Sequence, residues 1–253
     1  MLTLVGAGRI GTALAGLATA NDVEYLLVGR DHAGLIGEHD AGPIVVCTRN
    51  DDVAAVVQHC ARPDDLVFIQ NGAMRPWLAA RGLGDCTQGV LYFAVPKLRA
   101  PPESGGESVF FGRHASGLVY LLRRGNLAAR VVADDDELRT EIAYKLLWAA
   151  IFGLLGDLHQ ETVLASVARA REVAALVTEL APVCEAGLGA PVVADQATKR
   201  LLAYSRAIGS WRASAKEWPW RNGWLIECAR RHALATPLHD SLVAGWRQAG
   251  GVY

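Results

Sequence analysis

Glycines spaced as Gly-x-Gly-x-x-Gly follow the first apolar stretch of the chain, and this spacing is typical of a loop that holds a dinucleotide. The first glycine makes a tight turn after a strand, the second leaves room for a pyrophosphate, and the third lets the next helix lie close to the sheet. Free N–H groups at the helix start attract the anion. A plain tight turn is the alternative. We predict that the cofactor-binding loop consists of Gly6, Ala7, Gly8, Arg9, Ile10 and Gly11.

A single lysine interrupts a long apolar segment in the second half. Lys145 is the only charged residue in residues 142–156, IAYKLLWAAIFGLLG, and a helix this apolar is normally buried. Because burial disfavours an ammonium group, the side chain reaches solvent, pairs with Glu141 one turn earlier, or does chemistry. Ala149 and Gly153 follow on the same face and form a trough that we expect to accommodate a ligand. A buried lysine with a lowered pKa can donate a proton to a carbonyl oxygen.

Other polar residues are candidates for ligand contacts. Asn71 and Gly72 follow the apolar run LVFIQ, so we expect them at the carboxyl edge of a sheet, where open α/β sheets bind ligands. An ordinary turn is the alternative for this pair. Glu217 lies among tryptophans and is a candidate substrate contact, although Lys216 beside it also fits an exposed surface. Ser210 is compatible with a substrate contact or with a helix cap.

Two arginines bear on the type of cofactor. Arg30 ends the second predicted strand about twenty residues after the glycine loop, where an acid suits the ribose of NAD and an arginine suits the 2′-phosphate of NADP. This position favours NADP(H), although Asp31 follows directly and an exposed arginine is the alternative. Arg49 ends the third strand and is either a second cofactor contact or a surface residue.

The order of apolar segments predicts an α/β fold with two domains. Short apolar runs alternate with helical or loop connections up to residue 134, and this alternation is typical of a doubly wound, mostly parallel sheet. From there the pattern is helical to the end. We therefore predict a Rossmann-like dinucleotide-binding domain over residues 1–134 and an all-α substrate domain over residues 135–253. The expected strands are 23–28, 44–47, 66–69, 90–94, 109–111 and 130–132, and residues 100–106 are expected to form a surface loop.

Composition excludes several classes of protein. A net charge of −1 with dispersed basic residues argues against nucleic acid or a membrane surface as partners. We find no secretory signal and no apolar run long enough to span a bilayer. Five widely spaced cysteines argue against a disulfide framework and a zinc site, and favour the reducing cytoplasm. No metal site is predicted, and the absence of a Gly-x-Ser-x-Gly elbow argues against a hydrolase.

Taken together, these motifs resemble the ketopantoate reductases, or 2-dehydropantoate 2-reductases, along nearly the whole chain. The resemblance rests on the glycine loop, FIQNG, GVLYFA, the lysine helix, Glu217 and the closing NGWLIECARRHALATP. It implies a C-terminal domain like that of 6-phosphogluconate dehydrogenase, and NADPH-dependent reduction of a 2-oxo acid in pantothenate biosynthesis. It also implies that Lys145 is the proton donor, that Glu217 contacts substrate, that Asn71 lies near the nicotinamide, and that Arg49 helps to bind cofactor.

The chain also departs from that family, and these departures leave alternatives open. Family members typically carry asparagines where this chain has Ala149 and Gly153. The chain is also shorter, and Ser205 keeps the family's serine-to-glutamate separation better than Ser210. We predict a cytoplasmic NADPH-dependent reductase of a small 2-oxo acid. The alternatives are a nucleotide-binding sensor or scaffold without turnover, and a reductase of another carbonyl or imine substrate. The apolar second half is compatible with a homodimer.

Overall fold

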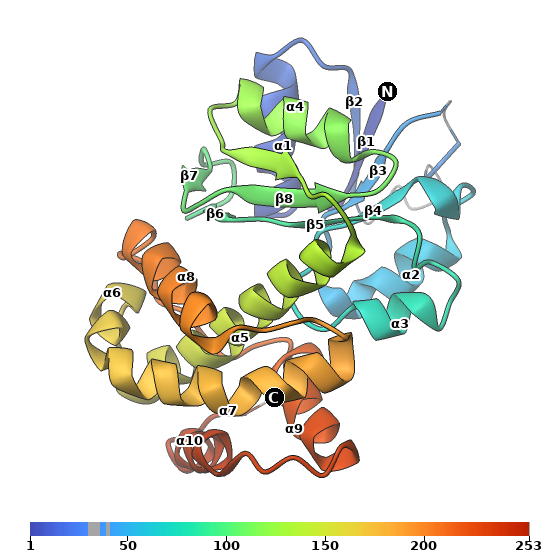
Figure 1. The fold of residues 1–253 in the computed structure, drawn as a ribbon. Helices are drawn as coiled ribbons and strands as arrows, with labels where there is room; N and C mark the ends of the chain where they lie inside the picture. Colours follow the sequence, from blue (N-terminus) through green and yellow to red (C-terminus); the bar gives the residue numbers. More distant parts are fainter. Residues whose placement is uncertain (30–35, 39–40, 253) are drawn as a thin grey trace. The chain divides into compact units, whose positions relative to one another are not determined.

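The structure, a computed structural model, describes residues 1–29, 36–38 and 41–252 and divides the chain into two compact units. Unit 1 comprises Met1–Gln70 and Trp77–Leu138, and unit 2 comprises Asn71–Pro76 and Arg139–Tyr253. The second unit therefore includes a short segment from the middle of the first predicted range. Figure 1 shows the elements of both units.

Within the described residues, unit 1 is built on a sheet of seven strands in the order β2-β1-β3-β4-β5-β8-β9. The first five of these strands pair in parallel, β8 runs antiparallel to β5, and β9 is parallel to β8. The sheet strands are β1 (Leu2–Val5), β2 (Tyr25–Val28), β3 (Ile44–Val46), β4 (Leu66–Phe68), β5 (Thr87–Val90), β8 (Ser108–Phe111) and β9 (Ala129–Val131). This topology confirms the predicted doubly wound, mostly parallel sheet.

Helices cover the sheet because its strands are apolar on both faces. The runs LTLV, IVV and LVF are buried at every residue, which is typical of parallel strands buried on both sides. On one face, apolar side chains of α1 and α4 pack with the strands in a single core, and Figure 1 shows α2 on the opposite side. The helices of this part of the chain are α1 (Arg9–Ala20), α2 (Val53–Gln58), α3 (Arg75–Ala79) and α4 (Ala115–Arg124), with 3-10 helices η2 (Asn50–Asp52) and η3 (Pro63–Asp65).

The order of the strands creates a switch point between β1 and β3. The chain passes from β1 to β2 on one side and then crosses to β3 on the other side of β1. Backbone hydrogen bonds fix this arrangement just beyond the strands, since the Gly6 amide donates to Val28 at 2.8 Å and the Cys47 amide donates to Val5 at 2.7 Å. The connections after β1 and β3 therefore diverge, and open α/β sheets bind their ligands in such a crevice.

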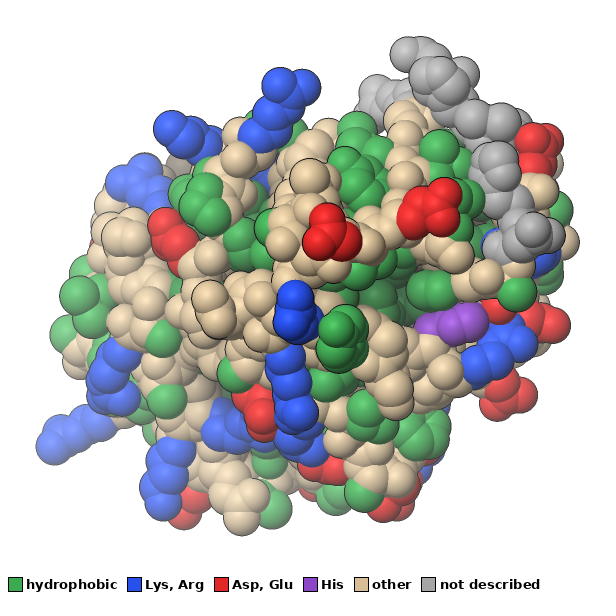
Figure 2. Space-filling model, turned by 90° about the horizontal axis from the view of Figure 1, so that it is seen from above, with side chains coloured by type: hydrophobic (Ala, Val, Ile, Leu, Met, Phe, Trp, Pro, Cys, Tyr) green, Lys and Arg blue, Asp and Glu red, His purple; other side chains and the backbone are tan. Residues whose placement is uncertain are grey.

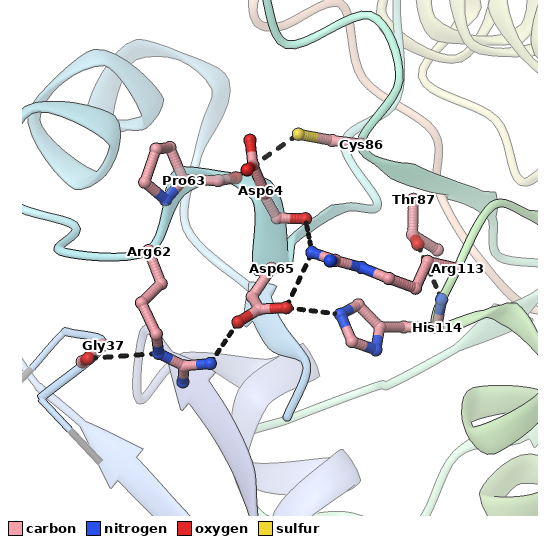
Figure 3. A network of polar contacts seen from close by, with 9 residues as sticks. All are labelled: Gly37, Arg62, Pro63, Asp64, Asp65, Cys86, Thr87, Arg113 and His114. Carbon is pink, nitrogen blue, oxygen red and sulfur yellow. Dashed lines mark hydrogen bonds and ion pairs between the residues drawn. The ribbon is translucent and has the colours of Figure 1, made fainter. Parts of the chain in front are cut away.

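A polar network joins strands at the opposite, amino-terminal edge of the parallel sheet (Figure 3). The carboxylate of Asp65, just before β4, accepts a hydrogen bond from Arg113 at 2.8 Å, lies 2.9 Å from the His114 ring and forms an ion pair with Arg62. The His114 amide also donates to the Thr87 hydroxyl of β5 at 2.9 Å. This network ties β4 and β5 to the start of α4, and it lies away from the crevice beyond the carboxyl ends of the strands.

Two expectations about unit 1 are wrong in detail. Residues 90–94 do not form one strand, because β5 ends at Val90 and a separate strand β6 (Phe93–Ala94) follows. Residues 100–106 are not only a loop, since they contain β7 (Glu103–Ser104), which pairs antiparallel with β6. A run of apolar residues predicts burial, but it cannot show where the backbone leaves one sheet and joins a second partner.

Unit 2 consists of helices around the long helix α5, which begins in unit 1. Side chains of α5 from Ala143 to Leu155 are nearly all buried, and α7 packs against α8, α9 and α10. α5 is long and apolar enough to cross a membrane by length and composition alone, but most of it is buried as in the core helix of a globular protein. The helices are α5 (Asp135–His159), α6 (Val163–Ser166), α7 (Ala170–Leu188), α8 (Ala194–Ala207), α9 (Asn222–Arg231) and α10 (Pro237–Gln248), with η4 (Val167–Arg169) and η5 (Trp218–Trp220).

Candidate functional site

The glycines of the first loop have three different surroundings. Gly6 has a φ of +112°, a conformation that favours glycine, and a Cβ there would lie 3.0 Å from the Cys47 backbone. A Cβ on Gly11 would lie 1.9 Å from the Gly6 carbonyl oxygen, so only glycine lets α1 start this close to the turn. A Cβ on Gly8, in contrast, would meet no atom of the described residues within 4 Å. The chain therefore needs Gly6 and Gly11 for its own packing, whereas Gly8 faces open space.

A cavity of about 600 Å³ opens at this loop, entirely within unit 1. Its size is within the range of small-molecule sites, and its wall is mostly apolar with a few polar groups, as in many such sites. α1 begins here without a side-chain cap on Gly8, so the backbone N–H groups of its first turn are available to an anion. The cavity is lined by Val5, Gly6, Ala7, Gly8, Val28, Gly29, Ile36, Cys47, Thr48, Arg49, Asp52, Ala55, Val56 and His59.

The cavity brings together some predicted cofactor contacts and adds others. Arg49 lines it, with a side chain that is 69% exposed and lies 4.0 Å from the Asp51 carboxylate. Thr48 was not predicted, yet its buried hydroxyl oxygen has no hydrogen-bond partner among the described residues, which suits a ligand hydroxyl or phosphate. His59 and Ile36 are also new members. The rule that placed Asn71 at a strand end would also have found Thr48, because it follows β3 beside the switch point. Arg30 lies outside the described residues.

Both charge signs occur on the face of the protein shown in Figure 2. Figure 2 shows acidic and basic side chains on the same face, with hydrophobic side chains between them. With a net charge of −1, the chain has close to equal numbers of both signs. Among the residues that the structure describes, no group of three or more metal-ligating side chains is found.

Lys145 is buried on α5 in unit 2, with an exposed fraction of only 4%. Its Nζ atom lies 3.8 Å from the centroid of the Tyr204 ring and 4.8 Å from that of the Trp148 ring. Burial, and then the positive charge of Arg221, hold the pKa of Lys145 well below its ordinary value. Such an amine exchanges its proton more readily near neutral pH than an exposed lysine does.

Arg221 forms an ion pair with Glu217, which lies four residues earlier in the chain. One guanidinium nitrogen of Arg221 contacts the Glu217 carboxylate, and both side chains are largely buried. Burial lowers the pKa of Arg221, and the charge of Glu217 opposes that shift. Glu217 itself has a φ of +52° just before η5, a conformation uncommon for a residue with a side chain. Pro219 lies in this short 3-10 helix, so no continuous helix runs through Glu217.

The backbone of the chain itself packs on Gly153, one of the two small residues of the trough expected beside Lys145, which corrects the expectation that a ligand lies against it. A Cβ on Gly153 would lie 3.0 Å from the Ser214 carbonyl oxygen, and one on Gly156 would lie 2.4 Å from that of Ala213. The small residues therefore let this extended backbone pack closely on α5. Their spacing on a helix face predicted a hollow, but it could not show which segment covers that face.

The glutamate one turn before Lys145 has another partner. Glu141, 2% exposed, accepts two hydrogen bonds from Arg200 of α8, of which the one from Nη2 measures 2.8 Å. The guanidinium group matches a carboxylate in this bidentate way better than an ammonium group can. Arg200 lies 59 residues after Glu141 in the sequence, so the spacing of residues along α5 could not predict this pair.

The remaining candidate residues lie in unit 2. Gly72, next to Asn71, has a φ of +103°, and a Cβ there would lie 2.5 Å from the Trp220 carbonyl oxygen. The Ala73 amide donates to that same oxygen at 2.8 Å. The segment with Asn71 therefore packs on the turn that follows Glu217. Ser210 is exposed after α8, whereas Ser205 is fully buried and accepts a hydrogen bond from the Trp148 indole at 2.9 Å.

The two-part plan of a Rossmann-like sheet followed by helices places the chain in the class of doubly wound α/β folds. Within that class it is the fold of the ketopantoate reductases, as solved structures show. D-mandelate dehydrogenase in a ternary structure with NADH and anilino(oxo)acetate matches with a TM-score of 0.75 at 14% identity, over 98% of both chains. 2-Dehydropantoate 2-reductase from Geobacter metallireducens matches with a TM-score of 0.72 at 19% identity, over 98% of this chain and 100% of the other.

A dimeric ketopantoate reductase from Staphylococcus aureus matches with a TM-score of 0.68 at 17% identity, over 98% of both chains. No protein-family model and no curated protein sequence matches the chain. At these identities the similarity establishes the fold alone.

Proposed function

We propose that this protein is an NADPH-dependent oxidoreductase that reduces a small 2-oxo acid to a 2-hydroxy acid. The observation that carries the proposal is the buried amine of Lys145, whose pKa is lowered by burial and by Arg221, in the fold of 2-oxo acid reductases. A general acid works best when its pKa is near the operating pH. A lysine shifted downward suits that task better than an exposed one.

The cavity of unit 1 is the proposed site of the cofactor. The open space over Gly8 and the N–H groups at the start of α1 suit a pyrophosphate, and the Thr48 hydroxyl and Arg49 suit a ribose or phosphate. When bound, the nicotinamide cofactor supplies the hydride for the reduction. We assign Arg30 and Arg49 to the 2′-phosphate region, which makes NADPH the preferred form.

Unit 2 supplies the proposed acid and the contacts to the substrate. Lys145 gives a proton to the carbonyl oxygen as that oxygen gains negative charge, and it is left as a neutral amine that solvent protonates again. Glu217, fixed by Arg221, accepts a hydrogen bond from the substrate. Asn71 and Ser210 are further proposed contacts to the cofactor or substrate. The substrate class follows from the fold relatives, and ketopantoate is the first compound to test.

The test compares a lysine variant with a matched control in the same unit. Lys145→Met removes the amine, and Lys199→Met removes an exposed amine on α8. NADPH affinity is measured by cofactor fluorescence, and turnover by NADPH absorbance with a panel of 2-oxo acids. We expect Lys145→Met to lose about 10²- to 10⁴-fold in kcat while still binding NADPH. Lys199→Met should behave as wild type.

Two results would contradict the proposal in different ways. If Lys145→Met turns over substrate near the wild-type rate, the lysine is not the acid. If wild-type protein binds NADPH but oxidises it with none of the 2-oxo acids, the protein is a nucleotide-binding sensor or scaffold. Turnover with an imine or another carbonyl compound alone would move the proposal to that substrate class.

The cysteines support a proposed cellular setting for the enzyme. All five cysteines are free, and Cys86, Cys184 and Cys228 are buried. Free cysteines are typical of a reducing compartment, so we assign the protein to the cytoplasm, with pantothenate biosynthesis as the proposed context. A homodimer is proposed by analogy with the dimeric relative, and light scattering at two protein concentrations tests it.

A further inference from the structure

Two aromatic rings surround the Lys145 amine inside unit 2. The Nζ atom lies over the Tyr204 ring at 3.8 Å from its centroid, and the Trp148 ring is 4.8 Å away. Both distances are within the range in which a cation is attracted to the negative face of a ring. Tyr204 is 7% exposed, so water screens this attraction weakly.

The two rings are held in place by their own contacts. Trp148 and Tyr204 meet edge to face with centroids 4.9 Å apart, and Trp148 also stacks on Phe152 at 5.9 Å. The indole N–H donates to the fully buried Ser205 hydroxyl at 2.9 Å. These contacts join α5 to α8, so the ring face under the amine is part of a packed wall and not a mobile side chain.

Some charged groups near the amine stabilise its protonated form, and others destabilise that form. Arg221, before α9, opposes the charge on Lys145, and Glu217 partly offsets Arg221 through their ion pair. Glu141 on α5 is engaged by Arg200 of α8. Both carboxylates have guanidinium partners, and the faces of the Tyr204 and Trp148 rings lie close to the amine as well.

We propose that Tyr204, packed edge to face on Trp148, is a positioning residue whose ring face binds the Lys145 ammonium and keeps it protonated in its buried place. This inference rests on the proposed function, because it explains how the proposed acid keeps its proton in an apolar wall. The phenol ring does this through its face, so the hydroxyl is not required. Tyr204→Phe should preserve the effect, and Tyr204→Leu should remove it.

The proton affinity of the amine can be measured without cofactor or substrate. The chain has only four lysines, at positions 97, 145, 199 and 216, so NMR of isotope-labelled lysine can follow each side chain through a pH titration. Lys145→Met assigns the signal. We expect the pKa of Lys145 to fall by about one unit in Tyr204→Leu and to stay near wild type in Tyr204→Phe. Tyr120→Leu, at an exposed tyrosine on α4, is the control.

The direction of the shift separates a cation–ring interaction from simple packing. If Tyr204 only excluded water, its removal would hydrate the amine and raise the pKa of Lys145 toward its ordinary value. A rise or no change in folded Tyr204→Leu would therefore overturn the proposal. If that variant does not fold, pentafluorophenylalanine at position 204 keeps the ring shape but removes the negative face. It should lower the pKa of Lys145, and an unchanged pKa would overturn the proposal.

Activity then distinguishes this inference from the proposed function. In the reductase, the basic limb of the kcat profile should move to lower pH in Tyr204→Leu, because the acid loses its proton earlier. A shift in the NMR titration without any wild-type turnover would support the positioning role and refute the reductase. Turnover that depends on Lys145, with no effect of position 204 on its pKa, would refute the positioning role alone.

Discussion

The sharpest test of the cofactor cavity is the substitution Gly8→Ala. Gly8 has a φ of −78° and a ψ of −167°, an extended conformation that alanine adopts without strain. The added Cβ meets no described atom of the protein within 4 Å. The substitution should therefore leave the fold intact, and the methyl group projects into the space that we assign to the pyrophosphate.

The expected magnitude follows from the contacts that the methyl group would displace. A hydrogen bond from a backbone N–H to a charged phosphate contributes about 1.5–3 kcal/mol. Losing one such bond weakens NADPH binding by about 10- to 100-fold. The free energy of unfolding of Gly8→Ala should change by less than about 1 kcal/mol. Fluorescence titration with NADPH and thermal unfolding without it measure the two effects separately.

The matched control is Gly16→Ala, in the exposed middle of α1. A Cβ there also meets no described atom within 4 Å, but the position is two turns away from the loop. Alanine should stabilise the helix by about 0.5–1 kcal/mol and leave the affinity for NADPH unchanged. If Gly8→Ala binds NADPH as tightly as Gly16→Ala does, the pyrophosphate does not lie over Gly8 and the proposed placement of the cofactor is wrong.

Two further predictions concern the stability of unit 2. Gly72→Ala should lower the free energy of unfolding by about 2–3 kcal/mol, because alanine there combines a positive φ with a Cβ 2.5 Å from the Trp220 carbonyl oxygen. The control is Gly82→Ala, because Gly82 has a φ of +70° but a Cβ there would meet no described atom within 4 Å. This substitution should lower the free energy of unfolding by only about 1 kcal/mol, and a urea titration measures both variants. Equal losses of stability in the two variants would contradict the role of the contact between residue 72 and the Trp220 carbonyl oxygen. Burial lowers the pKa of His239 from 6.5 to about 4. As the pH drops, His239 is therefore protonated first in the unfolded chain. The free energy of unfolding should fall by about 3 kcal/mol between pH 6.5 and pH 4. Urea titrations of wild type and His239→Gln measure this loss, and the same pH dependence in both would refute the assignment.

Local patterns in the sequence were sufficient to predict the elements whose conformation depends on residues close together in the chain. The glycine spacing predicted the turn between β1 and α1 because the steric limits on Gly6 and Gly11 act within a few residues. Continuous apolar runs predicted the parallel strands, since strands buried on both faces need no alternation. The apolar residues 142–156 likewise predicted a buried helix around Lys145, while a side chain that reaches solvent stayed among the alternatives.

The tertiary structure decided which groups surround these elements, because segments distant in the chain supply them. Arg200 and Tyr204 reach α5 from α8, so the partner of Glu141 and the ring under Lys145 could not be derived from helical spacing. Residues 213–215 cover Gly153 and Gly156 of α5, and the sequence predicted an open face at Gly153. Periodicity shows which face of an element is apolar or small. Only the packing of the whole chain determines whether that face meets a ligand or another part of the protein.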